Sequence, residues 1–147
     1  MIKIVTRDFG ELEVKEEQII SFPNGVYAFE EAKHFALISP LGDDVYPMWL
    51  QCTDNISPCF IVFEPTLIYE DYKIELTESE KALLKITDDS DVRALCTAKV
   101  PEDYKQTTVN MKSPIIINKK ERVATQVILP ADYPFRLPIY QSEKEAE

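Results

Sequence analysis

The sequence predicts a mainly β fold: an antiparallel β-barrel-like single domain with one short helix. Short runs of branched and aromatic residues recur at close spacing along the chain. Pro, Gly, Asn or Asp separates these runs and favours turns between them. Many short strands with so few helices are typical of a closed or nearly closed barrel, which hides strand edges. We expect one domain over residues 1–140 and a polar C-terminal tail over 141–147.

The chain opens with a predicted hairpin. Apolar and polar residues alternate over 2–6 and 11–15, and Asp8-Phe9-Gly10 supplies the turn between them. Further strands are predicted at 19–22, 35–38, 48–52, 60–63, 92–100, 107–111, 115–118 and 123–129.

The last two of these runs predict a second hairpin. They flank the turn-prone residues 118–122, and Pro114 stands where a strand begins, the position at which a sheet best tolerates proline. Asn110 and Gln126 carry amides that either cross-link neighbouring segments or contact a partner. Trp49 is expected in the core.

One segment predicts a helix instead. Thr77-Glu78-Ser79-Glu80 matches a capping box, in which the Thr77 hydroxyl accepts from the amide of Glu80 and the Glu80 carboxylate reaches back. Good helix formers follow at 81–85, and the run ends before the acidic stretch 88–91.

Composition excludes several classes of protein. The longest apolar run is far shorter than the ~20 residues of a membrane span, and the first residues lack a signal-peptide pattern, so we expect a cytoplasmic protein. The net charge of −10 disfavours direct nucleic-acid binding and favours basic protein partners, although such a charge also serves solubility alone.

Catalytic and metal-binding signals are weak. Cys52, Cys59 and Cys96 lack zinc or disulfide spacing and are expected to be buried thiols. His34 is the single imidazole and lies in a charged lead into a strand, where a solvated role is favoured. Three glycines are too few for a phosphate-binding loop. We therefore expect no enzyme, no metal and no cofactor.

Several short motifs resemble those of one known family. Thr108 to Asn118 spells T-x-N-x-x-x-P-I-I-I-N, and Gln126-Val127-Ile128-Leu129 follows a charged turn. The N-terminal stretch 20–30 contains F-P-N-G-V-Y-A-F-E, and the centre of the chain contains W-L-Q-C, F-I-V-F-E-P and Asp71-Tyr72. In this order the motifs resemble the FliW family of bacterial flagellar assembly factors. Ala28 replaces a usual glycine of that family, which suggests a different local turn.

The resemblance implies a β-barrel-like fold and two protein partners. These are flagellin, the filament subunit, and CsrA, a small dimeric RNA-binding repressor of translation. It implies that the protein antagonises the RNA binding of CsrA and couples flagellin synthesis to export. One alternative is a dedicated flagellin chaperone without a regulatory partner. Another is a small enzyme, which would need two carboxylates facing each other in an apolar pocket.

The resemblance assigns no contact residues, so local chemistry supplies the candidates. Turn aromatics and an exposed amide, and acidic runs that suit a basic partner, give Phe22, Asn24, Tyr27, Asp43, Asp44, Asp88, Asp89 and Asp91 as predicted partner-binding residues. For Phe22 the alternative is that its ring fills the barrel. The acidic runs do not match the ligand spacing of a calcium loop.

Overall fold

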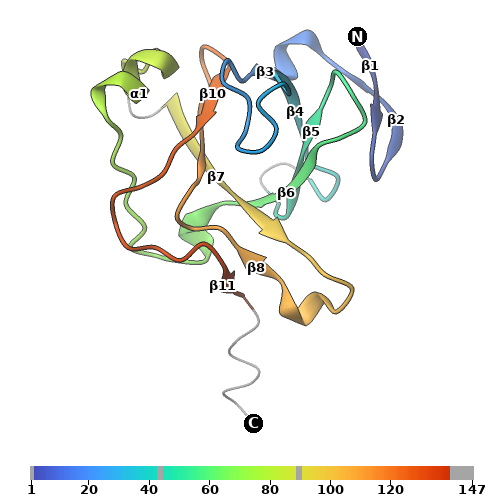
Figure 1. The fold of residues 1–147 in the computed structure, drawn as a ribbon. Helices are drawn as coiled ribbons and strands as arrows, with labels where there is room; N and C mark the ends of the chain where they lie inside the picture. Colours follow the sequence, from blue (N-terminus) through green and yellow to red (C-terminus); the bar gives the residue numbers. More distant parts are fainter. Residues whose placement is uncertain (1, 43–44, 89–90, 140–147) are drawn as a thin grey trace.

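Seven strands close into a barrel in this structure, a computed structural model that describes residues 2–42, 45–88 and 91–139. The strands follow one another around the barrel in the order β7, β6, β5, β4, β3, β10 and β9, and β9 pairs with β7 (Figure 1). Their bounds are β3 (Ile19–Ser21), β4 (His34–Ile38), β5 (Met48–Cys52), β6 (Cys59–Phe63), β7 (Val92–Lys99), β9 (Ile115–Asn118) and β10 (Val123–Gln126). The predicted barrel is confirmed.

Two features close the barrel. The long strand β7 pairs with β9 through its first half and with β6 through its second half, so it spans the seam. On the other side, β10 pairs with β3 in parallel, at Val123 and Ser21. This parallel pair departs from the expected all-antiparallel barrel. It is possible because β3 and β10 lie far apart in the chain, so no short turn between them forces antiparallel pairing.

The predicted hairpin of β9 and β10 is confirmed, with Ile115 opposite Gln126 and Asn118 opposite Val123. Strand β10 is shorter than predicted. Beyond it, Val127 donates to the carbonyl of Pro114, but proline has no N–H to return a ladder bond. The chain then continues alongside 112–114 without a regular strand.

Two short strands extend the sheet below the barrel. Strand β8 (Thr108–Val109) pairs with the end of β7, and β11 (Leu137–Pro138) pairs with β8 (Figure 1). Strand β8 ends earlier than predicted because the Asn110 side chain accepts from the amides of Lys112 and Ser113, which turns the chain. The sequence did not predict β11, which lies in a proline-rich segment.

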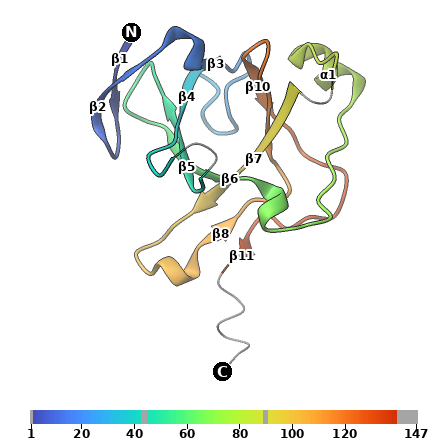
Figure 2. The same cartoon turned by 180° about the vertical axis from the view of Figure 1, so that it is seen from behind.

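The helix α1 (Glu78–Leu84) begins as predicted, because Thr77 and Glu80 form both bonds of the capping box. It lies on the side of the barrel opposite the N-terminal hairpin (Figures 1 and 2). Buried Asn118 attaches its end to the barrel by donating to the carbonyls of Leu84 at 2.8 Å and Lys85 at 3.1 Å.

The N-terminal hairpin forms a separate two-stranded sheet of β1 (Ile2–Thr6) and β2 (Gly10–Val14). Buried Ile4 and Val14 pack on Ala36 of β4 and so attach the hairpin to the barrel wall. Apolar side chains such as Phe35, Leu50 and Ile115 fill the barrel itself. Within the described ranges, no helix has the length and apolar character that crossing a bilayer requires.

Candidate protein-binding site

A groove of about 440 Å³ lies between two loops of the barrel. One loop connects β3 to β4 and the other connects β5 to β6. We call this depression the acidic groove, because three of its lining residues are carboxylates. Its lining comprises Ala28, Phe29, Glu30, Glu31, Ala32, Cys52, Asp54, Asn55, Ser57 and Pro58.

Two buried side chains hold the β3–β4 loop on the barrel. Phe22 is fully buried and packs at a tilted angle against Phe35 with ring centroids 4.8 Å apart, and Val26 is 3% exposed. The predicted surface role of Phe22 is therefore corrected, because its ring fills the barrel and is not available to a partner. With these anchors inside, Tyr27 and Phe29 remain at the surface, 51% and 44% exposed.

The turn of this loop depends on two residues with positive φ. Gly25 has φ of 65°, and a Cβ placed on it would lie 2.5 Å from the backbone of Glu30, so only glycine fits. Ala28 has φ of 73°. Alanine therefore adopts positive φ at this position and bears the strain of that conformation, and whether the turn differs from that of relatives stays a prediction.

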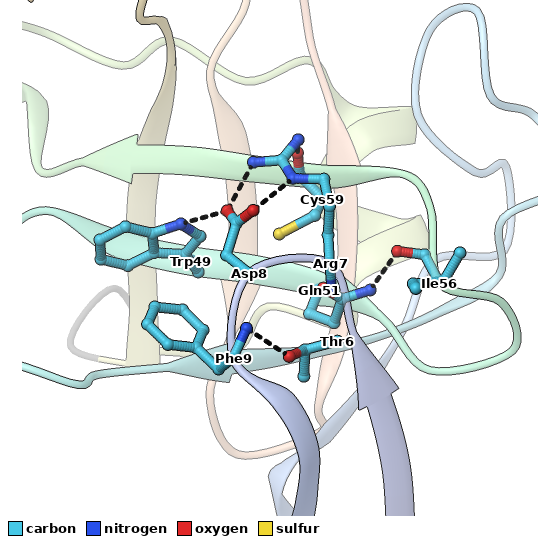
Figure 3. Close-up of polar contacts among 8 residues, drawn as sticks. All are labelled: Thr6, Arg7, Asp8, Phe9, Trp49, Gln51, Ile56 and Cys59. Carbon is cyan, nitrogen blue, oxygen red and sulfur yellow. Dashed lines mark hydrogen bonds and ion pairs between the residues drawn. The ribbon is translucent and has the colours of Figure 1, made fainter.

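Gln51 of β5 positions the other wall of the groove. It is fully buried, and its amide nitrogen donates to the carbonyl of Ile56 at 2.8 Å, which fixes the β5–β6 loop (Figure 3). Its amide oxygen accepts from the backbone N–H of Arg7 at 3.0 Å. One buried side chain therefore connects the groove to the turn of the N-terminal hairpin.

A charged cluster holds that turn against the barrel (Figure 3). The Asp8 carboxylate lies between the guanidinium of Arg7, at 2.9 Å, and the indole N–H of Trp49, at 3.0 Å. The hydrogen bond from Arg7 holds the pKa of Asp8 below its ordinary value. Phe9 packs edge-on against Trp49. The expectation of a core Trp49 is corrected, because this residue is only half-buried and binds the hairpin.

The chemistry of the acidic groove suits a protein ligand. Glu30, Glu31 and Asp54 are exposed around it, and the Asp54 carboxylate lies 3.0 Å from Nδ1 of His34. Phe29 supplies exposed apolar surface in the lining, and exposed Ile56 lies next to the lining residue Asn55 in the β5–β6 loop. A segment with basic side chains beside an apolar one would match this combination of charge and aromatic surface.

The structure brings two of the predicted residues together beside the groove. Asn24 and Tyr27 line a depression of about 350 Å³ between the β3–β4 loop and α1. Gln126 fixes this part of the loop, because it accepts from the N–H of Tyr27 and donates to the carbonyl of Ser113, both at 3.0 Å. The cross-linking role expected of Gln126 is confirmed, whereas the printed side-chain bonds of Asn110 lie within its own turn.

The acidic candidates lie elsewhere. The backbone carbonyl of Asp91 accepts from the N–H of Lys119, at the turn of the β9–β10 hairpin, and the N–H of Asp91 donates to the carbonyl of Asp88. Gln126 lies at the opposite end of that hairpin, so these two aspartates do not join Tyr27. Asp43, Asp44 and Asp89 lie outside the described residues, as does the predicted tail 141–147.

Sequence reasoning did not select the three carboxylates of the groove. Glu30 and Glu31 follow the aromatic motif directly, so their position beside Phe29 was a usable signal. The sequence around Asp54 gave no such signal, because only the pairing of β4 with β5 brings this residue beside the β3–β4 loop.

The three cysteines are free and buried, as expected. Burial raises the pKa of Cys59 to about 11 and that of Cys96 to about 12. Both thiols are therefore protonated and unreactive at neutral pH. Within the described ranges, no group of three or more His, Cys, Asp or Glu side chains is arranged to hold a metal ion.

Comparison with known proteins identifies the family. The family model described as "FliW protein" matches residues 3–139. The chain belongs to the FliW family. It is 39% identical over 140 residues to the flagellar assembly factor FliW of Caldicellulosiruptor bescii, covering 95% of this chain and 91% of that protein. The FliW of Carboxydothermus hydrogenoformans is 34% identical over 139 residues, covering 95% and 90% of the two chains.

A solved structure of the FliW family confirms the fold. It is described as the crystal structure of the flagellar assembly factor FliW, and it matches with a TM-score of 0.86 at 30% identity. The match covers 94% of this chain and 96% of that one. The motifs that suggested the FliW family have structural roles here: Gly25 forms the groove turn, Gln51 connects the β5–β6 loop to the turn of the N-terminal hairpin, and Asn118 attaches the helix.

Proposed function

We propose that this FliW-family chain is a flagellar assembly factor that binds CsrA and flagellin and antagonises the RNA binding of CsrA. In this role it couples flagellin synthesis to flagellin export. Membership of the FliW family supports the assembly function. The observation that supports a basic partner is the acidic groove, where Glu30, Glu31 and Asp54 surround exposed aromatic surface.

The physical basis of the antagonism is electrostatic. An RNA-binding protein presents basic residues to phosphates, and a body of net charge −10 attracts such a surface and weakens its hold on RNA when bound beside it. A bound partner could also shift the conformation of the RNA site, and either route gives the same linkage between the two binding events. We place the protein in the cytoplasm, where both partners are made.

The test is release of RNA from a preformed CsrA–RNA complex, measured by fluorescence anisotropy of labelled RNA. We expect the parent protein to release the RNA at micromolar concentration. Full retention of RNA at saturating protein would contradict the proposal. Recovery of flagellin but never of CsrA in a pull-down from the native bacterium would favour the alternative, a dedicated flagellin chaperone.

Charge reversal tests whether CsrA binds at the acidic groove. The double change Glu30→Lys and Glu31→Lys should weaken CsrA binding by roughly ten-fold or more, because it reverses two charges at the contact. The matched control is Glu75→Lys with Glu102→Lys, which are exposed and lie outside the groove lining. Both variants have a net charge of −6 instead of −10. Equal effects would show that net charge matters and the groove does not.

A further inference from the structure

A second pocket in this acidic protein has the opposite charge. It measures about 200 Å³ and lies where β3, β4 and the β9–β10 turn meet. We call it the cationic pocket, and we define it by six of its lining residues: Gln18, Ile20, Leu37, Ile117, Lys119 and Arg122. Arg93 and Glu17 complete its lining, so three cations face one carboxylate.

Two of these cations are available to a ligand. Lys119 and Arg122 are exposed, and neither forms an ion pair with any described carboxylate. Arg122 donates one N–H to the backbone carbonyl of Glu16 at 3.0 Å, which orients its guanidinium and leaves other donors of the fork unused. Arg93 has a different role, because it donates to the Tyr46 hydroxyl at 2.7 Å.

The floor of the pocket is apolar. Ile20 and Ile117 are 8% and 3% exposed, and half-buried Leu37 lies between the polar rim and the barrel core. A bare inorganic anion would lose hydration on such a floor without compensation. An anion that carries an aliphatic group is stabilised twice, because its charge contacts the cations and its aliphatic group packs on the apolar floor.

The size of the pocket and the net charge of the protein restrict the class of ligand further. The pocket is smaller than the ~300 to 1,000 Å³ of sites for drug-sized molecules, so it accommodates one short aliphatic group. The net charge of −10 repels polyanions such as nucleic acids but affects a monoanion much less.

We propose that the cationic pocket binds an aliphatic monocarboxylate. The carboxylate lies against Lys119 and Arg122, and a branched group of leucine size packs on Ile20, Leu37 and Ile117. Two sources can present this chemistry: a free branched-chain acid, or the last residue of a polypeptide that ends in an aliphatic side chain. This site is separate from the acidic groove and does not depend on the function proposed for it.

The experiment is a titration of the full chain followed by NMR of its isoleucine and leucine methyl groups. The probes are 4-methylpentanoate, N-acetyl-leucine, neutral N-acetyl-leucinamide, and acetate, which has the charge without the aliphatic group. We expect saturable shifts at Ile20, Leu37 and Ile117 from the first two probes, with Kd on the order of millimolar. Tighter binding of N-acetyl-leucine indicates a polypeptide end, and tighter binding of 4-methylpentanoate indicates a free acid.

A pair of variants tests the role of the cations. Lys119→Gln with Arg122→Gln should raise the Kd of the better probe by roughly ten-fold. Lys120→Gln, an exposed neighbour outside the pocket lining, should change it less than about two-fold. Absence of shifts with both carboxylates, equal binding of the neutral amide, or equal loss in the two variants would overturn the proposal.

Discussion

Single residues set the shape of the acidic groove, and Gly25 is the most constrained of them. Its φ is 65°, and its α-hydrogens face the backbone of Glu30 so closely that a methyl group has no space. Backbone atoms cannot move aside as the end of a long side chain can. Both conformation and space therefore require glycine at this position.

Gly25→Ala should lower the free energy of unfolding by more than about 2 kcal/mol, because it adds a backbone clash to the left-handed strain of about 1 to 2 kcal/mol. Gly10→Ala is the matched control. Gly10 has the same φ of 65°, but a Cβ there meets nothing within 4 Å. The free energy of unfolding that Gly10→Ala loses should therefore stay near the contribution of left-handed strain alone. Urea unfolding measures both, and equal losses would contradict the close contact.

Ala28 presents the opposite case, an alanine held at φ of 73°. Ala28→Gly should raise the free energy of unfolding by about 0.5 to 1 kcal/mol, since relief of left-handed strain exceeds the added entropy of the unfolded chain. Ala131→Gly, at an exposed site without positive φ, should lower it slightly. Thermal unfolding of both variants checks the sign of the change in stability. Destabilisation by Ala28→Gly would contradict the claim that Ala28 is strained.

At the scale of elements, a few polar side chains fix how separate segments pack. Gln51 connects the N-terminal hairpin and the β5–β6 loop, while Gln126 connects the β3–β4 loop and the turn before β9. Both walls of the acidic groove therefore rest on side-chain amides that lie within strands. An amide in this position can hold a loop against the barrel because it supplies both a donor and an acceptor.

The docking of the hairpin should depend on acid pH through Asp8. Its pKa lies below the ordinary value of 3.8, mainly because of the hydrogen bond from Arg7. A depressed pKa in the folded state stabilises at pH above the unfolded value, and this contribution disappears as pH falls through the folded pKa. The docked hairpin should therefore persist down to about pH 4 and loosen below it.

Fluorescence of Trp49, the single tryptophan, reports this step because its indole N–H donates to Asp8. We expect constant emission from neutral pH to about pH 4 and a change below it, before global unfolding seen by circular dichroism. The Asp8→Asn variant cannot ionise and should lack the separate step. An emission change centred above pH 5 in the parent would assign the transition to another group.

At the scale of the whole molecule, charge is distributed unevenly. The net charge is −10, yet the cationic pocket carries three cations and one carboxylate, and the acidic groove carries three carboxylates. The two depressions therefore favour ligands of opposite charge. Long-range attraction governs the encounter with a basic protein, while the local charges decide where each ligand lies.

Association with CsrA should therefore depend on salt, and its rate should fall as ionic strength rises. Reversing Asp43 and Asp44, or Asp88 and Asp89, to lysine should slow association several-fold for at least one pair and flatten the salt dependence. Stopped-flow measurement between about 50 and 300 mM salt checks this, across the range in which screening changes most. Binding of the parent protein that does not change with salt would exclude electrostatic steering.

The sequence by itself determined the local elements of this protein. Alternating and branched runs marked the strands, and the capping box located α1, because both signals depend on neighbouring residues. The order of a few short motifs along the chain also indicated the FliW family. The predicted ends of β8 and β10 were less accurate. The Asn110 side chain turns the chain soon after β8 begins, and the missing N–H of Pro114 interrupts the pairing of another strand with β10.

Only the tertiary structure decided what these elements enclose. The parallel pair of β3 and β10, the burial of Phe22, and the meeting of Asp54 with Glu30 and Glu31 all join residues far apart in the chain. The same is true of the cationic pocket, where Leu37 and Lys119 meet. Local sequence does not predict such neighbours, because they come together only when the barrel closes.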